Sequence, residues 1–209
     1  MRTGILLTGL IATIAVAVRD REPAPEPRTA PLAASLGDSE ATRLRAELSA
    51  ARQELEAANA RLERWHRIFA FANRYNISSD LAGSIYDIAS AEGIEPELAF
   101  RVVKLESDFK ERARSSVGAI GLTQLMLPTA RYFQKNVTRE ELYDRETNLR
   151  IGFRYLRGLI KEYKTVNLAL LVYNRGPAAV LAAREEGVDP SNGYDRIILR
   201  GYTGDGVIE

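Results

Sequence analysis

The chain has 209 residues, with 29 lysines and arginines against 28 aspartates and glutamates, which gives a formal net charge of +1. Basic and acidic residues alternate along the whole chain, so the basic patch typical of nucleic-acid binding is missing and no nucleic-acid partner is expected. The absence of cysteine excludes disulfides, thiolate metal sites and a cysteine nucleophile. The single histidine, His66, argues against Ser-His-Asp catalysis and histidine-rich metal sites. The length suits one domain with accessory segments.

The N-terminus has the pattern of a targeting segment. Arg2 precedes an uncharged, mostly apolar run over 3–18, which Arg19 and Asp20 close. As a helix this run would be about 24 Å long, at about 1.5 Å per residue, whereas a membrane span usually needs about 20 residues. It therefore fits either a short membrane anchor or a signal peptide cleaved at the small-x-small site 15–17. Both alternatives direct the rest of the chain out of the cytoplasm.

A spacer and a long helix are expected next. Residues 21–37 contain four prolines, which favours extended, solvated chain. Ser39, or alternatively Asp38, can cap the helical block that follows. Its apolar residues alternate spacings of four and three through nearly four heptads: Leu44, Leu48, Ala51, Leu55, Ala58, Leu62, Trp65 and Phe69. This pattern fits either a coiled coil that joins two copies through residues 44–69, or one amphipathic helix that lies on its own domain or forms a stalk.

The remaining chain is predicted to be helical. Helices are expected from Ser79 or Asp80 to Glu92, over 96–107, over 128–134, after a capping box at 138–141, along an inner face at 149–163, and over 167–175, 177–186 and 191–202. No stretch alternates apolar and polar residues in the manner of a substantial sheet. We therefore divide the chain into a targeting segment (1–20), a linker (21–37), a long helix (38–75) and an all-α domain (76–209).

Glu106 is the first candidate for chemistry. On a helix over 96–107 it lies in the last turn, beside an apolar stripe formed by Leu98, Val102, Leu105 and Phe109. Apolar neighbours and the negative end of the helix dipole both raise the pKa of a carboxyl group. A raised pKa is what a general acid needs near neutral pH. Taken alone, however, Glu106 fits better with a helix-end glutamate that points to water or pairs with a base.

The residues that follow Glu106 form a more specific pattern. Glu106-Ser107 is followed by Ala-x-Ser-x-x-Gly-Ala-x-Gly-Leu-x-Gln over 113–124, by Asn-x-x-x-Gly-x-x-Tyr-Leu over 148–156, and by Tyr-Asn-x-Gly over 173–176. In this order and spacing, the motifs resemble the catalytic domain of soluble-type (SLT) lytic transglycosylases. The resemblance covers roughly residues 80–202. It implies an all-α, lysozyme-like helical domain, preceded here by the coiled-coil-like helix and the N-terminal hydrophobic segment.

The resemblance also implies roles for individual residues. Glu106 is expected to be the single catalytic acid and base. The expected substrate-binding residues are Ser107, Ser115, Gln124, Tyr173, Asn174 and Tyr194, of which Tyr194 would hydrogen-bond near the glutamate. The implied partner is the peptidoglycan glycan strand, cleaved at a MurNAc–GlcNAc β-1,4 bond with closure of a 1,6-anhydro sugar. No cofactor or metal is implied, and the expected location is the periplasm or cell envelope, with residues 3–18 as an inner-membrane anchor in one alternative.

Several positions depart from the family pattern. Thr123 stands where the family often has methionine, Val172 and Arg175 replace common alanines, and 191–193 read Ser-Asn-Gly where a Glu-Thr pair often precedes the final tyrosine. These departures affect the expected shape of the substrate groove, and Arg175 alters which glycans fit. Three alternatives stay open: a hydrolytic muramidase, a non-catalytic peptidoglycan-binding scaffold that works through its coiled coil, and a wall-opening subunit of a larger envelope machine.

Overall fold

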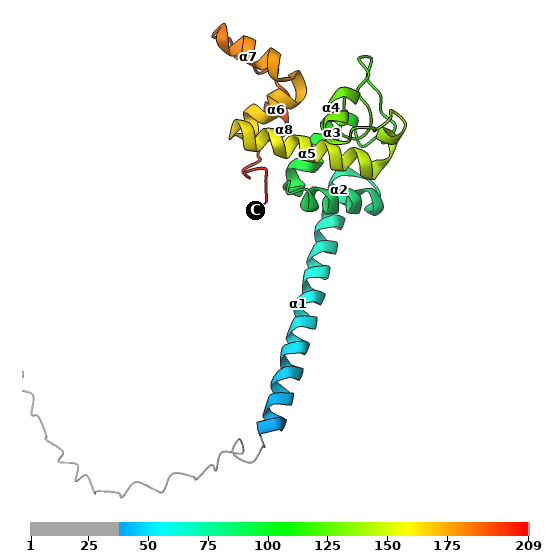
Figure 1. The fold of residues 1–209 in the computed structure, drawn as a ribbon, viewed down its shortest axis with the longest axis vertical. Coiled ribbons are helices and arrows are strands. Elements are labelled where there is room, and N and C mark those ends of the chain that lie inside the picture. The colour runs from blue at the N-terminus through cyan, green and yellow to red at the C-terminus, as the bar shows by residue number, and fades with distance from the viewer. Residues whose placement is uncertain (1–37, 209) are drawn as a thin grey trace, which may run out of the picture. The chain divides into compact units, whose positions relative to one another are not determined.

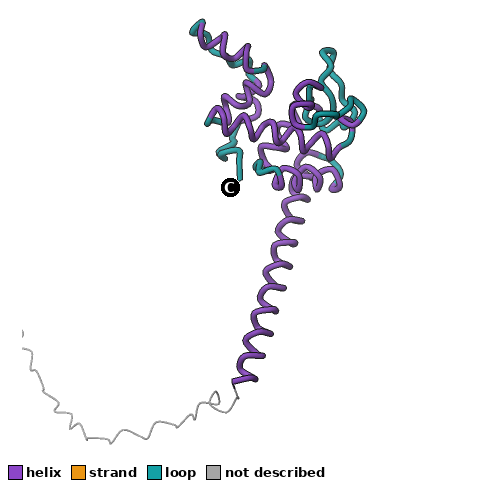
Figure 2. The backbone as a smooth tube through the Cα atoms, in the orientation of Figure 1, coloured by secondary structure: helices purple, strands orange, loops and turns teal. Residues whose placement is uncertain are grey.

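A computed structural model of the chain describes residues 38–208 and contains, in that range, helices and isolated β-bridges but no strand (Figure 1, Figure 2). The expectation of an all-α fold is therefore confirmed. The predicted targeting segment and linker lie outside the described residues. The helices are α1 (Asp38–Tyr75), α2 (Ser79–Ala91), α3 (Pro96–Ser107), α4 (Leu127–Phe133), the 3-10 turn η2 (Glu141–Tyr143), α5 (Arg145–Tyr163), α6 (Val166–Arg175), α7 (Pro177–Glu185) and α8 (Tyr194–Leu199).

The chain divides into two compact units, and the division falls inside α1. The first unit ends at Glu56, and its described helical residues are almost all exposed. The second unit begins at Ala57, because the C-terminal turns of α1 contribute Ile68 and Ala72 to its core. The compact part of the chain thus includes the last turns of the long helix as well as the residues that follow it.

Aromatic rings fix these last turns of α1 to α3. Phe71 stacks on Phe100 with ring centroids 4.1 Å apart, and Tyr75 stacks on the same ring at 5.6 Å. Phe100 itself is fully buried. Such stacked pairs contribute about 0.5–1.5 kcal/mol beyond the area that they bury. This packing fixes the last turns of α1 within the second unit.

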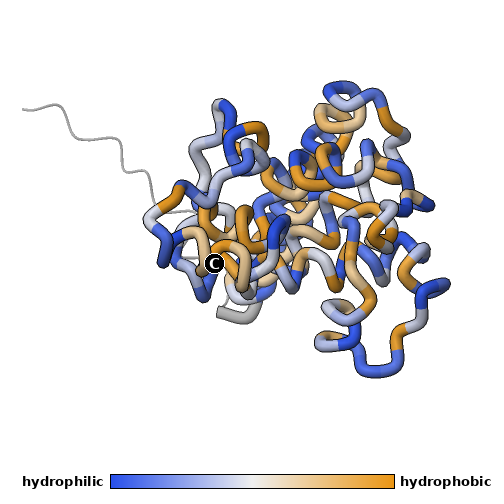
Figure 3. Tube along the Cα trace, turned by 90° about the horizontal axis from the view of Figure 1, so that it is seen from above, coloured by the Kyte–Doolittle hydropathy of each residue, from blue (hydrophilic) through white to orange (hydrophobic). Residues whose placement is uncertain are grey.

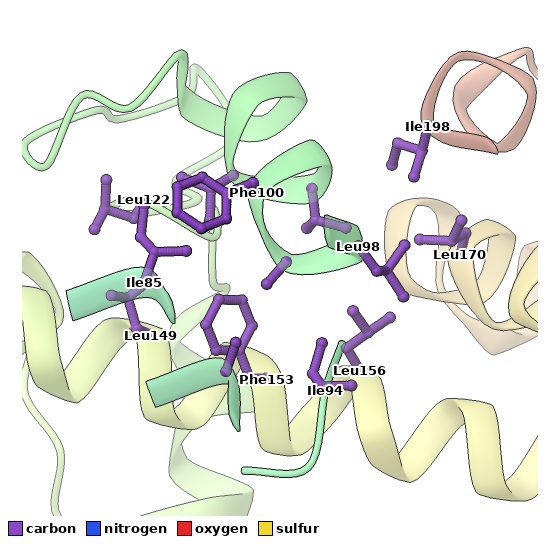
Figure 4. Packing of buried hydrophobic residues seen from close by; sticks show 14 of the residues in the cluster. Ile85, Ile94, Leu98, Phe100, Leu122, Leu149, Phe153, Leu156, Leu170 and Ile198 are labelled. Atoms are coloured by element: carbon purple, nitrogen blue, oxygen red, sulfur yellow. The ribbon is translucent and has the colours of Figure 1, made fainter. Parts of the chain in front are cut away.

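The core of the second unit is built around α5. Its buried face, with Leu149, Phe153 and Leu156, packs against Leu98 of α3 and Leu170 of α6 (Figure 4). Ile198 extends the same cluster to α8. In Figure 3 the apolar segments lie mostly toward the inside of this unit, and the hydrophilic segments lie at its outer turns. Burial of this apolar surface is the main force that holds the short helices together.

Local capping sets where the helices begin. Ser78 caps α2, because its hydroxyl oxygen accepts the backbone N–H of Leu81 at 3.1 Å; the cap lies one residue before the predicted Ser79. Asp144 caps α5 in the same way through the N–H of Thr147. The predicted capping box is present, with Glu141 accepting the N–H of Thr138 at 2.8 Å. These caps satisfy amide groups that a helix leaves open at its first turn.

In residues 38–208 no single helix combines the length and the apolar composition needed to cross a membrane. Helices α6 and α7 together would pass that test, but they meet at a bend of 114°. The apolar run over 3–18 is not among the residues that the structure describes, so its prediction stands as made.

Candidate active site

Glu106 lies in the last turn of α3, as the sequence predicts. The helix stops directly after it, because Asp108 and Phe109 both adopt left-handed backbone conformations, with φ of 53° and 60°. Such conformations are uncommon outside glycine. They are stabilised here by the burial of Phe109, which is 8% exposed, and by the ion pair between Asp108 and Lys104. This turn directs the chain away from Glu106 and toward the loop at 110–126.

The carboxyl group of Glu106 is partly buried and accepts a hydrogen bond from Tyr194. Burial raises its pKa from 4.5 to about 7, while the Tyr194 hydroxyl opposes the rise by donating a hydrogen bond to Oε1 at 2.5 Å. Burial is the larger effect, because few polar groups replace the water that the carboxylate loses. Burial also raises the pKa of Tyr194 well above its usual value, so the phenol stays protonated and can donate. The site therefore holds a carboxyl group that is poised between its two protonation states at neutral pH.

No other acid in the described part of the chain contributes to the pKa shift of Glu106. Its pKa shift has two causes, burial and Tyr194, and neither is another acid. Asp108, the nearest acid in sequence, is exposed to solvent and forms an ion pair with Lys104. This ion pair keeps the pKa of Asp108 below its usual value. Within residues 38–208, no three acidic or histidine side chains come together as a metal-binding group.

Two of the predicted substrate-binding residues hold hydrogen bonds inside the protein. Ser107 is 6% exposed, and its hydroxyl donates to the carbonyl of Val103 at 3.1 Å. The hydroxyl oxygen of Ser115 accepts the N–H of Ala119 at 2.9 Å and closes the turn at 115–119. The structure thus places Ser107 and Ser115 where they shape the loop that follows Glu106.

Asn148 connects this loop to α5, and sequence reasoning gave it no role. Its buried side-chain amide donates to the carbonyls of Ile120 (2.9 Å) and Leu142 (2.8 Å), and its oxygen accepts the N–H and the hydroxyl of Thr123 (2.9 and 2.7 Å). Thr123, one of the departures from the family pattern, is therefore fully buried as a hydrogen-bonding residue. The motif around Asn148 was visible in the sequence, but its contacts depend on a loop some 25 residues away.

The two motif glycines explain how closely this loop approaches α5. A Cβ atom at Gly121, whose φ is +77°, would lie 2.2 Å from Nδ2 of Asn148. A Cβ atom at Gly152 of α5 would lie 2.4 Å from Oγ1 of Thr123. Both distances are far below van der Waals contact, so a side chain at either position would force the loop and the helix apart.

A groove of about 370 Å³ lies next to this loop. Three of the predicted substrate-binding residues line it, namely Gln124, Tyr173 and Asn174, together with Met126, Tyr155 and Arg175. Tyr155 and Tyr173 stand with ring centroids 5.2 Å apart and give the groove an aromatic wall. Sugar-binding sites commonly combine such flat apolar surfaces with a few polar groups.

Tyr173 links the groove to Glu106, which is not itself a lining residue. The Tyr173 hydroxyl donates to the carbonyl of Thr123 at 2.8 Å. Burial raises the pKa of Tyr173 well above its usual value, and the negative charge of Glu106 raises it further. Glu106 is therefore close enough to act on a group that forms the groove wall.

The loop before α8 holds the other side of the site. Asn192 donates a hydrogen bond from Nδ2 to Oδ1 of Asn174 at 2.8 Å, and Arg175 donates to the carbonyl of Pro190. The hydroxyl of Ser191 donates to the buried Asp195 at 2.6 Å. The Ser-Asn-Gly departure at 191–193 thus forms contacts that join the groove to the helix that carries Tyr194.

The comparison with known families gives one match that covers the site. The sequence model of the family described as Transglycosylase SLT domain matches residues 84–191, just over half of the chain. A transglycosylase of Enterobacteria phage PRD1 is 40% identical over 89 residues, which are 42% of this chain and 32% of that protein. The soluble lytic murein transglycosylase of Escherichia coli (strain K12) is 26% identical over 138 residues, covering 54% of this chain and 21% of that protein.

The solved structures agree at the level of the fold. The 70 kDa soluble lytic transglycosylase of Escherichia coli superimposes with a TM-score of 0.52 at 24% identity, covering 65% of this chain and 26% of that chain. This chain thus spans about a third or less of the curated relatives that it matches. Because the family match includes Glu106, the 113–124 loop and the Tyr-Asn pair at 173–174, the chain belongs to the Transglycosylase SLT domain family and has its lysozyme-like helical fold.

Proposed function

We propose that this chain is a peptidoglycan lytic transglycosylase that cleaves MurNAc–GlcNAc β-1,4 bonds, with Glu106 as its single acid and base. The observation that carries the proposal is the partly buried Glu106 carboxyl group, which accepts a hydrogen bond from Tyr194 and has a pKa raised to about 7. At neutral pH about half of the molecules then hold the proton that the leaving oxygen needs. The names of the relatives, a transglycosylase and a soluble lytic murein transglycosylase, support the same reaction class.

The reaction would proceed in two proton transfers at the same carboxyl group. Glu106 gives its proton to the glycosidic oxygen while the bond from that oxygen to C1 of MurNAc breaks. The substrate's own N-acetyl group stabilises the positive charge that develops at C1. The ionised Glu106 then takes the proton from the C6 hydroxyl, whose oxygen bonds to C1 and closes the 1,6-anhydro ring. No water is consumed, and the carboxyl group ends in the state in which it began.

Other side chains would hold the glycan and the acid. Tyr194 orients the carboxyl group through its hydrogen bond to Oε1. Gln124, Tyr173 and Asn174 face the groove and are the proposed sugar contacts. Any contact of the glycan with Ser115 would use a hydroxyl oxygen that already accepts a protein hydrogen bond, which its second lone pair permits.

The mechanism requires only one acid, and this distinguishes it from hydrolysis. A glycosidase that uses water or a protein nucleophile usually places two carboxylates across the scissile bond. Among the described residues, no second acid contributes to the pKa shift of Glu106, which supports a route with one carboxyl group. The lone acid therefore favours attack by the C6 hydroxyl over attack by water.

The remaining segments would place this domain at the cell wall. We propose residues 76–209 as the catalytic domain, 38–75 as a coiled-coil stalk through which two copies pair, and 21–37 as a spacer. Residues 1–20 would export the chain as a signal peptide or hold it in the inner membrane. The enzyme would then act in the periplasm or cell envelope, where its glycan substrate lies.

Incubation with purified sacculi tests the proposal. The wild-type chain should release soluble fragments whose masses are one water lower than those of hydrolysed fragments. Glu106→Gln should lose this activity, whereas Glu140→Gln, which changes an exposed glutamate paired with Arg112, should retain it. Turnover by Glu106→Gln within about tenfold of wild type, or ~1.4 kcal/mol in the barrier, would remove Glu106 from its role.

The same incubation separates the alternatives. Fragments without the loss of water would identify a muramidase. A chain that pellets with sacculi but releases nothing, in wild-type and variant forms alike, would be a binding protein or scaffold.

A further inference from the structure

Helix α1 carries an apolar stripe that remains accessible along most of its length. Six large side chains of the heptad pattern are each about half exposed: Leu44 48%, Leu48 52%, Leu55 61%, Leu62 54%, Trp65 47% and Phe69 50%. Ile68 and Ala72, on a neighbouring face, supply the contacts with the core. A helix that presents an apolar stripe to water is stabilised when another helix covers it. The stripe is therefore a docking surface, and the charges beside it indicate what covers it.

The charged residues that flank the stripe alternate in a regular way. With Leu48, Leu55, Leu62 and Phe69 at heptad position a, position g holds Glu40, Glu47, Glu54 and Arg61, and position e holds Arg45, Arg52, Asn59 and His66. In a parallel pair of helices, each g residue faces the e residue five positions later in the other copy. Glu40 then meets Arg45, and Glu47 meets Arg52. Each of these attractions occurs twice by symmetry.

An antiparallel pair has less favourable charges. In that arrangement g faces g and e faces e. With the stripes fully overlapped, so that Leu44 of one copy lies opposite Phe69 of the other, Glu54 of each copy faces Arg61 of the other and Glu47 faces the apolar Ile68. This arrangement has two attractive contacts between opposite charges, whereas the parallel pair has four. Arg45 and Arg52 then have only His66 and Asn59 as neighbours. The parallel arrangement contains no pair of formally like charges with histidine neutral.

We propose that α1 pairs with α1 of a second copy of this chain as a parallel, in-register, two-stranded coiled coil along residues 44–69. Leucine and phenylalanine fill position a, while Ala51 and Ala58 at position d let the two helices approach closely. Glu47 also forms an ion pair with Arg43 of its own helix, with Oε1 of Glu47 2.8 Å from Nε of Arg43. Both partners of that pair are well exposed, at 78% and 56%, so it competes only weakly with a contact across the dimer.

Single cysteines in the full chain test the direction of pairing, because the natural sequence has none. In a parallel, in-register dimer, identical d positions face each other. Ala51→Cys and Ala58→Cys should therefore each form disulfide-linked dimers on their own. Ala60→Cys, at the outward f position of the same helix, is the matched control and should cross-link several times more slowly. In the overlapped antiparallel pair Ala51 would instead face Leu62 of the other copy. Cross-linking only when the Ala51→Cys and Leu62→Cys chains are mixed would therefore mean antiparallel pairing and would overturn the proposal.

Reciprocal charge reversal tests the partner without cysteine. Sedimentation of the full chain in detergent should show dimers of wild type, and a monomeric wild type or a trimer would overturn the proposal. The Glu47→Arg dimer and the Arg52→Glu dimer should each dissociate at a higher protein concentration than the wild-type dimer. An equimolar mixture of the two variants should form dimers as stable as those of wild type. Glu56→Arg, at an outward position, should behave as wild type. Failure of the mixture to recover would show that these charges do not face each other.

Discussion

The raised pKa of Glu106 predicts that this residue lowers the free energy of unfolding at alkaline pH. The Glu106→Gln variant should not show that decrease. The folded-state pKa is about 7, against 4.5 in the ordinary state. Between these values the folded chain binds a proton that the unfolded chain does not, so the free energy of unfolding falls as pH rises. Below 4.5 both states are protonated and the effect vanishes. Above about 7 it is complete.

The magnitude follows from the two pKa values. A shift from 4.5 to about 7 corresponds to roughly 3 kcal/mol, at about 1.4 kcal/mol per tenfold change in proton affinity. Glutamine has nearly the shape of protonated glutamic acid and keeps an oxygen that can accept the Tyr194 hydroxyl. Relative to wild type, Glu106→Gln should therefore gain about 3 kcal/mol between pH 4 and pH 8. A higher free energy of unfolding for Glu106→Gln than for wild type at pH 8 would show that Glu106 destabilises the folded chain at that pH.

Urea unfolding of both chains at several pH values measures the difference, with the near-ultraviolet circular dichroism of the tyrosines as the signal. Asp108→Asn is the control. The pKa of Asp108 is lowered by Lys104, so its contribution to stability is lost only at more acid pH and should stay constant across this window. A stability difference between Glu106→Gln and wild type that does not change with pH would refute the buried, proton-binding carboxyl group.

Three further predictions concern the surroundings of Glu106. Tyr194→Phe removes a hydrogen bond that lowers the Glu106 pKa. In a pH–activity profile measured on sacculi, the alkaline limb should therefore shift to higher pH, and kcat should fall by about tenfold. Asn148→Ala removes the hydrogen-bond partner of the buried Thr123 N–H and of the Leu142 carbonyl, while the Ile120 carbonyl keeps the N–H of Leu125, and urea unfolding should show a loss of at least about 2 kcal/mol. Arg175 is the single charged residue among the described residues that line the groove. Arg175→Gln should therefore weaken the binding of glycan strands with free carboxylates several-fold, but leave the binding of amidated strands unchanged. A co-sedimentation assay in the inactive Glu106→Gln background would measure both.

Much of the helical layout is readable from the sequence because its signals are local. Pro96 begins α3, the box at 138–141 precedes η2, and the apolar face at 149–163 lies within α5. Each of these depends on residues within one or two turns of one another. The cap of α2 was misplaced by one residue, because Ser78, Ser79 and Asp80 are all competent caps and only backbone geometry selects Ser78.

The candidate site was predictable in part. The position of Glu106 at a helix end follows from local helix signals. Its selection over an ordinary helix-end glutamate required the motifs that follow it, because the apolar stripe alone favoured the ordinary interpretation. The bond from Tyr194 agrees with the family resemblance. The role of Asn148 was not predictable, because its partners come from a loop and a turn that tertiary packing brings to α5. Ser107 and Ser115 carry motif positions, but the structure uses their hydroxyls within the fold. Sequence order alone cannot separate a side chain that faces a groove from one that supports its wall.

The helix that carries Tyr194 has only six residues and depends on contacts at both ends. Asn167 and Ser191 hold Asp195 at its first turn, each at 2.6 Å. Arg101 of α3 donates to the carbonyls of Ile198 and Arg200 at its end, both at 2.8 Å. These bonds fix α8 against the helix that carries Glu106, so the tyrosine hydroxyl needs no rearrangement to meet the carboxyl group.

That fixed hydroxyl matters for the proposed mechanism, in which one carboxyl group both gives and takes a proton. In water a glutamate with a pKa near 4.5 would be protonated in only about one molecule in three hundred at pH 7, and the first transfer would fail for lack of acid. Burial alone would raise the pKa of Glu106 above 7 and make the carboxylate a stronger base. It would also leave the group largely protonated, with no donor to stabilise its ionised form. The Tyr194 bond opposes burial and brings the pKa to about 7. The fold therefore sets two opposing effects on Glu106 so that both proton transfers lie close to balance at the pH where the chain would work.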